Sequence, residues 1–506
     1  MPMADQFQNS CDQSKLAWEL FTKFWTPEIH DHIRTCTNEK LKIRYNKQEA
    51  FTATEFNTWF QILMVMMVSP RSAMTDHWSN NPMFGNQFIK SMMTSDAWFE
   101  IYRNLQFDVD QEDPVVDTIP QPTGIFQNEK EILKEIQRQR YDNEINDGIR
   151  RIKWLTDAIQ AAFNKSFAED IDISEKSDFC MDETLIPYLG WLDFRQYLPD
   201  KPHPFGLLVR VLALAKSRFI VKFELYTGKR GEKRSNQLYD LMYRFMTSIN
   251  TTGIPKKTFY ADNYYSSFAV CKMLQEQGWE FRMTIRKNRC KGFCTTNMLI
   301  GESKLHENIS DYDFQLFEQQ VKKTKTVRMI FSNGSTKESE VKRNYKPTIS
   351  RPKILHEYNQ NYSTIDKLDQ LTYYMRFPHR CQKWTTCMFI YCIHICILQA
   401  HSLFCLTLKR QISIIDFMLL LIDAIQPHTH TQIRQKEVLG NIDSLLVAHE
   451  LISLKQVRPE IKDPIGHCYT CGERTRWICA CEYYYCKTCH VKHLLIEQEQ
   501  ILSRGK

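Results

Sequence analysis

The stretch 256-KKTFYADNYYSSF-268 predicts a buried strand that ends abruptly at an acid. Residues 258–260 have the β-branched and aromatic side chains of a core strand, and Asp262 follows them. Asp is an ordinary turn residue, so a turn is the simplest interpretation of this acid. The alternative is chemical, because ligands of α/β sheets bind at the carboxyl ends of strands.

A helix is predicted directly after this acid. Ser266 or Ser267 can cap a helix over residues 268–277, and Gly278 is a stop signal after it. The stretch therefore predicts a strand, an acid and a capped helix in this order.

The chain is long enough for several domains. Its 506 residues correspond to roughly three or four domains at about 150 residues each. The composition, 43% hydrophobic and 25% charged, is that of a globular protein. The net charge of +7 is modest, so any affinity for nucleic acid has to come from clustered Lys and Arg.

The sequence indicates an intracellular protein with no membrane partner. Its first residues lack the basic and then apolar plan of a signal peptide. The apolar stretch 387–408 is long enough to span a membrane, but His394, Gln399 and His401 interrupt it. We therefore predict a buried helix there. The 17 cysteines suit a reducing compartment, where thiols stay free or bind metal.

The character of the sequence changes several times along the chain. Residues 10–110 and 364–456 have helical patterns, whereas residues 178–290 have strand patterns. The segment 291–355 is rich in lysine and contains short strand-like pieces. A polar, acidic link with prolines at 108–124 separates the first helical region from a charged helix.

Cysteines and histidines near the carboxyl end predict a zinc module. The candidate ligands are Cys468, Cys471, Cys479, Cys481, Cys486, Cys489, His490 and His493. Closely spaced thiolates each supply two corners of a tetrahedron, and eight ligands suit a cross-braced module with about two Zn²⁺ ions. A structural zinc site has no open position, so we expect the module to recognise DNA, a histone tail or a ubiquitin-conjugating enzyme.

Three further acids are possible companions of Asp262. Asp182 lies on a strand-like run, and Asp366 and Asp369 share one face of a helix. Each has a simpler interpretation. Asp182 would be a strand-edge charge, Asp366 a capping-box carboxylate that pairs with Ser363, and Asp369 a solvated helix residue. Spacing alone does not bring these acids together.

Several long motifs, in the same order along the chain, resemble the piggyBac-type DNA transposases. They include FTATEFNTWFQILMVMMV (51–68), MDETLIPYLGWLDFRQYLPDKPHPFG (181–206), FYADNYYSS (259–267), YNQNYSTIDKLDQ (358–370) and the terminal Cys/His module. The likeness extends over nearly the whole chain.

This resemblance implies an α/β fold with a ribonuclease-H-like catalytic core. By motif, it implies that Asp182, Asp262 and Asp366 hold two Mg²⁺ ions, and that Asp369 is an additional acid of the site. Three carboxylates can hold two such hard cations. The implied reaction cuts double-stranded DNA at transposon ends and joins the 3′-OH ends to TTAA targets.

The resemblance also implies a domain organisation. We predict an N-terminal tail (1–30), a split helical dimerisation and DNA-binding domain (31–177 and 376–456), a split catalytic core (178–290 and 356–375), a β-rich insertion (291–355) and a Cys/His-rich zinc-binding domain (460–506).

Basic and aromatic residues near the predicted catalytic strands are candidate DNA contacts. They are Arg195, Tyr197, Lys201, Arg286, Lys287, Arg289 and Lys291, together with Trp384. Lys and Arg can neutralise phosphates, and Trp384 could stack on an unpaired base. The simpler interpretations are a solvated charged face and a core aromatic.

The sequence departs from the family at four positions. Ser363 and Thr364 replace two glycines that precede the third acid, Leu208 stands where Lys is common, and Leu214 stands where Asp is usual. None of these removes a predicted metal ligand.

We therefore expect a nuclear, homodimeric DNA transposase, either mobile or domesticated. The first alternative is a domesticated DNA- or chromatin-binding protein that keeps the acids without cutting. The second is a ubiquitin ligase, an interpretation that rests only on the zinc module.

Overall fold

The stretch 256–268 folds as its pattern predicts. Strand β5 (Thr258–Ala261) is buried at all four residues. Ser267 caps helix α8 (Phe268–Glu276), because its side-chain oxygen accepts a hydrogen bond from the backbone N–H of Val270. Gly278 follows the helix in the left-handed region, with a φ of 71°.

The computed structural model describes most of the chain. The described residues are 10–45, 51–108, 150–228, 237–425 without 291, 296, 308, 310–312, 344–345, 376 and 378–382, and the short pieces 451–453, 466–467, 474–475 and 477–479. The chain divides into two units, Met1–Ile425 and Gln426–Lys506.

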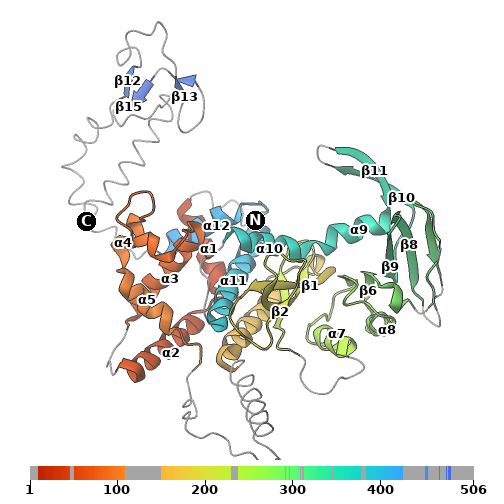
Figure 1. Cartoon of the computed structure of the whole chain (residues 1–506), viewed down its shortest axis with the longest axis horizontal. Coiled ribbons are helices and arrows are strands. Elements are labelled where there is room, and N and C mark those ends of the chain that lie inside the picture. Colours follow the sequence, from red (N-terminus) through yellow and green to blue (C-terminus); the bar gives the residue numbers. More distant parts are fainter. Residues whose placement is uncertain are drawn as a thin grey trace, which may run out of the picture. The chain divides into compact units, whose positions relative to one another are not determined.

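The first unit combines helices with a mixed sheet (Figure 1). Its helices are α1 (Ser10–Thr22), α2 (Pro27–Tyr45), α3 (Ala53–Val68), α4 (Gln87–Met92), α5 (Ser95–Asn104), α7 (Gln237–Thr247), α8, α9 (Lys353–Tyr362), α10 (Thr364–Tyr374), α11 (Trp384–Leu408) and α12 (Ile414–Ile425), with residues 150–169 also helical. Short 3-10 helices are η2 (Met74–Trp78), η3 (Ile173–Glu175) and η4 (Lys287–Arg289). Its strands are β1 (Asp178–Pro187), β2 (Gln196–Tyr197), β3 (Phe205–Leu214), β4 (Ile220–Leu225), β5, β6 (Glu280–Thr284), β7 (Ser303–His306), β8 (Gln315–Lys322), β9 (Lys325–Phe331), β10 (Glu338–Arg343) and β11 (Lys346–Pro352).

Nine of these strands form one sheet, in the order β2-β3-β1-β5-β6-β9-β8-β7, with β4 also paired to β3. Strand β1 is antiparallel to β3 and parallel to β5, and β5 is parallel to β6. In the β1–β5 register, Met181 pairs with Ala261. The residues that follow this pair are Asp182 and Asp262, so the sheet places two of the predicted acids on neighbouring strands.

The segment predicted as an insertion, 291–355, is rich in strands. Strand β9 pairs with β6, so β7–β9 continue the central sheet, and β10 and β11 form a separate hairpin. At the other end of the chain, α1 packs against α11 and α12 and buries Leu16, Ala17 and Phe21. Residues 10–22 therefore belong to the helical core, although we predicted a tail there. The other domain boundaries stay predictions.

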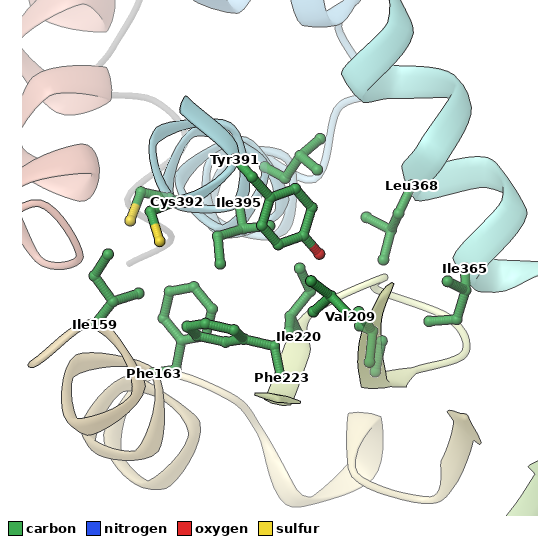
Figure 2. Packing of buried hydrophobic residues seen from close by; sticks show 14 of the residues in the cluster. Ile159, Phe163, Val209, Ile220, Phe223, Ile365, Leu368, Tyr391, Cys392 and Ile395 are labelled. Atoms are coloured by element: carbon green, nitrogen blue, oxygen red, sulfur yellow. The ribbon is translucent and has the colours of Figure 1, made fainter. Parts of the chain in front are cut away.

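Helix α11 confirms the prediction of a buried helix for residues 387–408. It is long and apolar enough to span a membrane, but 94% of its most apolar window is buried inside the protein. Figure 2 shows Tyr391 and Ile395 of α11 facing Val209 and Ile220 of the sheet. The long apolar stretch is therefore explained by packing against the sheet.

The polar side chain of Gln399 in this helix completes the edge of the sheet. Its amide group donates to the carbonyl oxygen of Ile220 at 2.7 Å and accepts from the N–H of the same residue at 2.8 Å. Gln160 makes a similar pair of hydrogen bonds with the next part of β4. Its side-chain amide donates to the carbonyl oxygen of Val221 and accepts from the backbone N–H of Phe223. The two glutamines replace the neighbouring strand that β4 lacks on this side.

In the second unit, β12 (Leu451–Ser453) pairs with β15 (Trp477–Cys479), and β13 (Gly466–His467) pairs with β14 (Arg474–Thr475). Of the predicted zinc ligands, Cys479 is described only through its backbone in β15. The other seven, Cys468, Cys471, Cys481, Cys486, Cys489, His490 and His493, lie outside the described residues.

The hydrogen bonds from Gln399 and Gln160 to β4 lead to a stability prediction. Replacing Gln399 with Leu leaves two buried backbone groups of Ile220 without partners, so we expect a loss of about 2–5 kcal/mol in unfolding free energy. Gln160→Leu is the matched control, with an expected loss of about 1 kcal/mol, because water can reach the half-buried Gln160 site. Urea unfolding followed by tryptophan fluorescence measures both. A Gln399→Leu variant as stable as the wild type would contradict the role of these hydrogen bonds.

Candidate active site

Asp182 lies on the face of β1 that packs against helices. Its side chain is 7% exposed, which excludes the interpretation as a strand-edge charge. Its Oδ2 accepts a hydrogen bond from the hydroxyl of Tyr362 at 3.0 Å, and its Oδ1 accepts from the backbone N–H of Glu183 at 2.9 Å. The carboxylate is therefore held in one orientation by the protein itself.

Helices α9 and α10 are attached to the same face of β1 through every second residue of the strand. The Cys180 thiol donates to the carbonyl oxygen of Tyr362 at 3.0 Å, and Asp182 accepts from the hydroxyl of Tyr362. Thr184 donates to Oδ1 of Asp369 at 2.6 Å. Residues two apart point to the same side of a strand, so one face of β1 fixes the position of both helices.

Helix α10 carries the other two predicted acids in different environments. Asp366 is exposed in the first turn, and its predicted capping partner Ser363 makes no side-chain cap hydrogen bond. Asp369 is half-buried and is held by Thr184. It is therefore not the solvated residue of the simpler interpretation.

Burial raises the pKa of the Asp182 carboxyl to about 8. The negative charges of Glu183 and Asp262 act in the same direction, so these three acids lie close enough to repel one another. The pKa of Asp262 is also raised, first by burial and then by the charge of Glu183, while Arg286 opposes the shift. Burial raises the pKa of Asp369 to about 6.

Three residues that the sequence analysis did not select take part in this arrangement. Glu183 accepts a hydrogen bond from the hydroxyl of Tyr265 at 2.9 Å, which joins β1 to the loop that follows Asp262. Tyr362 bonds directly to Asp182. The position of Glu183 beside Asp182 was a visible signal, but nothing in the sequence pattern shows that two tyrosines reach these acids.

The chain matches a known protein family over most of its length. The family model described as Transposase IS4 matches residues 17–401, which is most of the chain. The chain belongs to the IS4/piggyBac-type family of transposases. The family predicted from the sequence motifs is thus confirmed.

The fold of the chain is similar to that of a solved structure. A piggyBac transposase, solved in a synaptic complex with hairpin DNA, is similar with a TM-score of 0.59 and 18% sequence identity. The match covers 81% of this chain and 80% of that chain. At this identity the likeness shows the fold alone. It confirms the predicted α/β class, and the sheet of this fold is mixed.

The first group of candidate DNA contacts in this transposase-family chain lies in the loop after β1. Lys201 donates to the backbone oxygen of Glu183 at 3.4 Å, and its charge also acts on Asp369. Arg195 donates to the backbone oxygens of Leu189 and Gly190 and lies over the Phe205 ring, whereas Tyr197 is exposed. Lys201 therefore lies near the acids, whereas Arg195 forms hydrogen bonds within its own loop.

The second group follows β6. Arg286 is exposed and donates to the Asn263 side chain at 2.7 Å, next to Asp262. Arg289 donates from one nitrogen to three backbone oxygens of the loop 263–266, so it braces that loop. Lys287 is exposed, and Lys291 lies outside the described residues.

Trp384, the first residue of α11, is half-buried. Its ring is nearly perpendicular to that of Phe194, with the ring centroids 5.3 Å apart, and it packs against the core. This contact favours the core interpretation over base stacking.

The acids fit the divalent cations that the family implies. Asp182, Asp262 and Asp366 offer carboxylate oxygens, the donors that Mg²⁺ prefers. None of the ion pairs between described residues includes these three acids, so their charge is not neutralised by a Lys or Arg contact. In the same described ranges, no three acidic, His or Cys side chains already surround a common ion position.

The raised pKa of Asp182 predicts how stability depends on pH. An unfolded Asp has a pKa near 3.8, so between this value and about pH 8 the folded chain binds more protons than the unfolded chain. The contribution of Asp182 to stability therefore falls as pH rises through this window. We expect Asp182→Asn to raise the melting temperature relative to wild type, by a difference that grows from about pH 4 to about pH 8.

Differential scanning fluorimetry without added divalent cations measures this difference. Asp240→Asn, at an exposed carboxyl on α7, is the control and should show no such trend. An Asp182→Asn difference that stays constant across the pH range would contradict a carboxyl with a raised pKa.

Proposed function

We propose that this chain is a metal-dependent DNA transposase that cuts DNA at transposon ends and joins the 3′-OH ends to TTAA targets. The observation that carries this proposal is the grouping of the predicted acids. Asp182 and Asp262 follow a paired position of β1 and β5, and α10, with Asp366 and Asp369, is attached to the same face of β1. This grouping occurs in a chain of a transposase family.

The proposed roles follow from these environments. Asp182, Asp262 and Asp366 would hold two Mg²⁺ ions, which supply activation of the attacking oxygen and stabilisation of the leaving oxygen in an in-line displacement. Asp369 is bonded to Thr184, so we assign it the role of holding α10 in place. We propose that Lys201 and Arg286, whose charges act on Asp369 and Asp262, bind DNA phosphates near the acids.

Double-stranded DNA is the partner that we propose. Support comes from the similar solved structure, which is a piggyBac transposase bound to hairpin DNA. We further propose a homodimer that acts in the nucleus. Its catalytic core would be ribonuclease-H-like, since β1 pairs with an antiparallel β3 on one side and the parallel β5 and β6 on the other.

A second candidate is a DNA-binding protein of the same family that keeps the acids without cutting. The observation that favours it is the exposure of Asp366 on α10, whereas Asp182 and Asp262 are more buried. In the described ranges, no three such groups are close enough to hold one ion. Metal-dependent nicking of DNA separates the two candidates.

The nicking assay also tests each acid. We expect Asp182→Asn, Asp262→Asn and Asp366→Asn each to lower Mg²⁺-dependent cleavage by more than about 100-fold, because an amide removes a ligand charge with little change in shape. Asp369→Asn should cost about 10–100-fold, as for loss of an outer-shell partner. Substantial cleavage by any of the first three variants would reject that residue as a ligand. A wild-type protein that binds DNA but never nicks it would support the second candidate.

We also propose that the Cys/His cluster is a zinc module. We propose DNA as its partner, and a ubiquitin-conjugating enzyme is the alternative. We expect about two zinc ions per chain after dialysis against a mild chelator, and a lower content in Cys468→Ser and Cys486→Ser. Elemental analysis measures this content. Zinc near zero in a folded wild-type protein would reject the module.

A further inference from the structure

The junction between α9 and α10, residues 362–364, is fixed to the sheet by side chains at both of its ends. At the start of the junction, Tyr362 bonds to β1 through its hydroxyl and its carbonyl oxygen. At the end, the buried hydroxyl of Thr364 lies 3.1 Å from the carbonyl oxygen of Ala215, just after β3. Asp366 follows two residues later, so these contacts also fix the position of the turn of α10 that carries the third acid.

Two tyrosines on one side of α9 reach the two strands that carry the other acids. Tyr358 and Tyr362 are four residues apart, and their rings stack with centroids 5.0 Å apart and planes 9° apart. The Tyr362 hydroxyl donates to Asp182 at 3.0 Å, and the Tyr358 hydroxyl donates to the carbonyl oxygen of Ala261 at 3.3 Å. Only the first of these bonds reaches a carboxylate.

We propose that Tyr362 is a positioning residue for the cation site, and this inference rests on the proposed function. A carboxyl group rotates easily about its last torsion. Without the Tyr362 hydroxyl, Asp182 would keep the hydrogen bond from the backbone N–H of Glu183 to its Oδ1, but its Oδ2 would lose its partner. The Tyr362 hydroxyl adds the second hydrogen bond that fixes the carboxylate, and it links Asp182 to the junction that leads into α10. Such partners of metal ligands typically contribute about 10–100-fold in metal affinity or activity.

This role differs from simple packing. The Tyr362 ring is held by Tyr358 and its carbonyl oxygen by Cys180, and neither contact needs the hydroxyl. Tyr362→Phe therefore keeps the stacked ring and removes one hydrogen bond, the bond to Asp182. The matched control is Tyr358→Phe, which removes a buried hydroxyl from the same helix and leaves Asp182 untouched.

The experiment measures Mn²⁺ binding to the full-length, zinc-loaded protein by isothermal titration calorimetry without DNA. We expect Tyr362→Phe to weaken Mn²⁺ binding by about 10–100-fold and Tyr358→Phe by less than about 3-fold. Melting temperatures of the two variants should be similar. Wild-type affinity in Tyr362→Phe, or equal weakening in both variants, would overturn the positioning role.

Asp182→Asn separates a failure of this inference from a failure of the proposed function. If Asp182→Asn binds Mn²⁺ as the wild type does, the cation site itself is wrong. If it binds weakly, Tyr362→Phe should cause no further loss in the Asp182→Asn background, because the hydroxyl acts through that carboxylate. An additional loss of the full size in the double variant would show that Tyr362 acts elsewhere, even if the single variant folds poorly.

Discussion

The bonds made by one face of β1 hold the candidate active site together. Cys180, Asp182 and Thr184 alternate along the strand, and each bonds to the helix pair α9–α10. Because β1 is also paired in register with β5, the same strand aligns Asp182 with Asp262. A shift of β1 by one residue would turn these three side chains to the other face of the sheet. The relative positions of all the predicted acids therefore depend on this strand.

The site is electrostatically unfavourable by itself. Asp182, Glu183 and Asp262 repel one another in a partly buried region. Burial is the largest cause of the raised pKa values of Asp182 and Asp262. Basic side chains oppose this effect at two of the acids: Arg286 lowers the pKa of Asp262, and Lys201 lowers the pKa of Asp369. Under the proposed function, bound cations would relieve this repulsion.

Local patterns predicted much of the fold. The strand and the capped helix around Asp262 and the buried helix α11 follow from residue types and their spacing, whereas the α/β class was implied by the family resemblance. The parts that were missed depend on contacts between distant residues. Gln399 in an apolar helix completes a strand edge, and Tyr362 reaches Asp182 from 180 positions away. Spacing along one sequence carries no signal for such pairs, whereas the family resemblance supplied the grouping of the acids.

The most direct test of the central claim is to locate a cation in the folded protein. Crystals of the full chain grown with Mn²⁺ would show the ion by its anomalous scattering. The geometry predicts Mn²⁺ bound between Asp182 and Asp262, with Asp366 turned toward it and the Tyr362 hydroxyl still on Asp182. Mn²⁺ bound elsewhere in the protein, with Asp182 and Asp262 free of it at saturating concentration, would contradict the account.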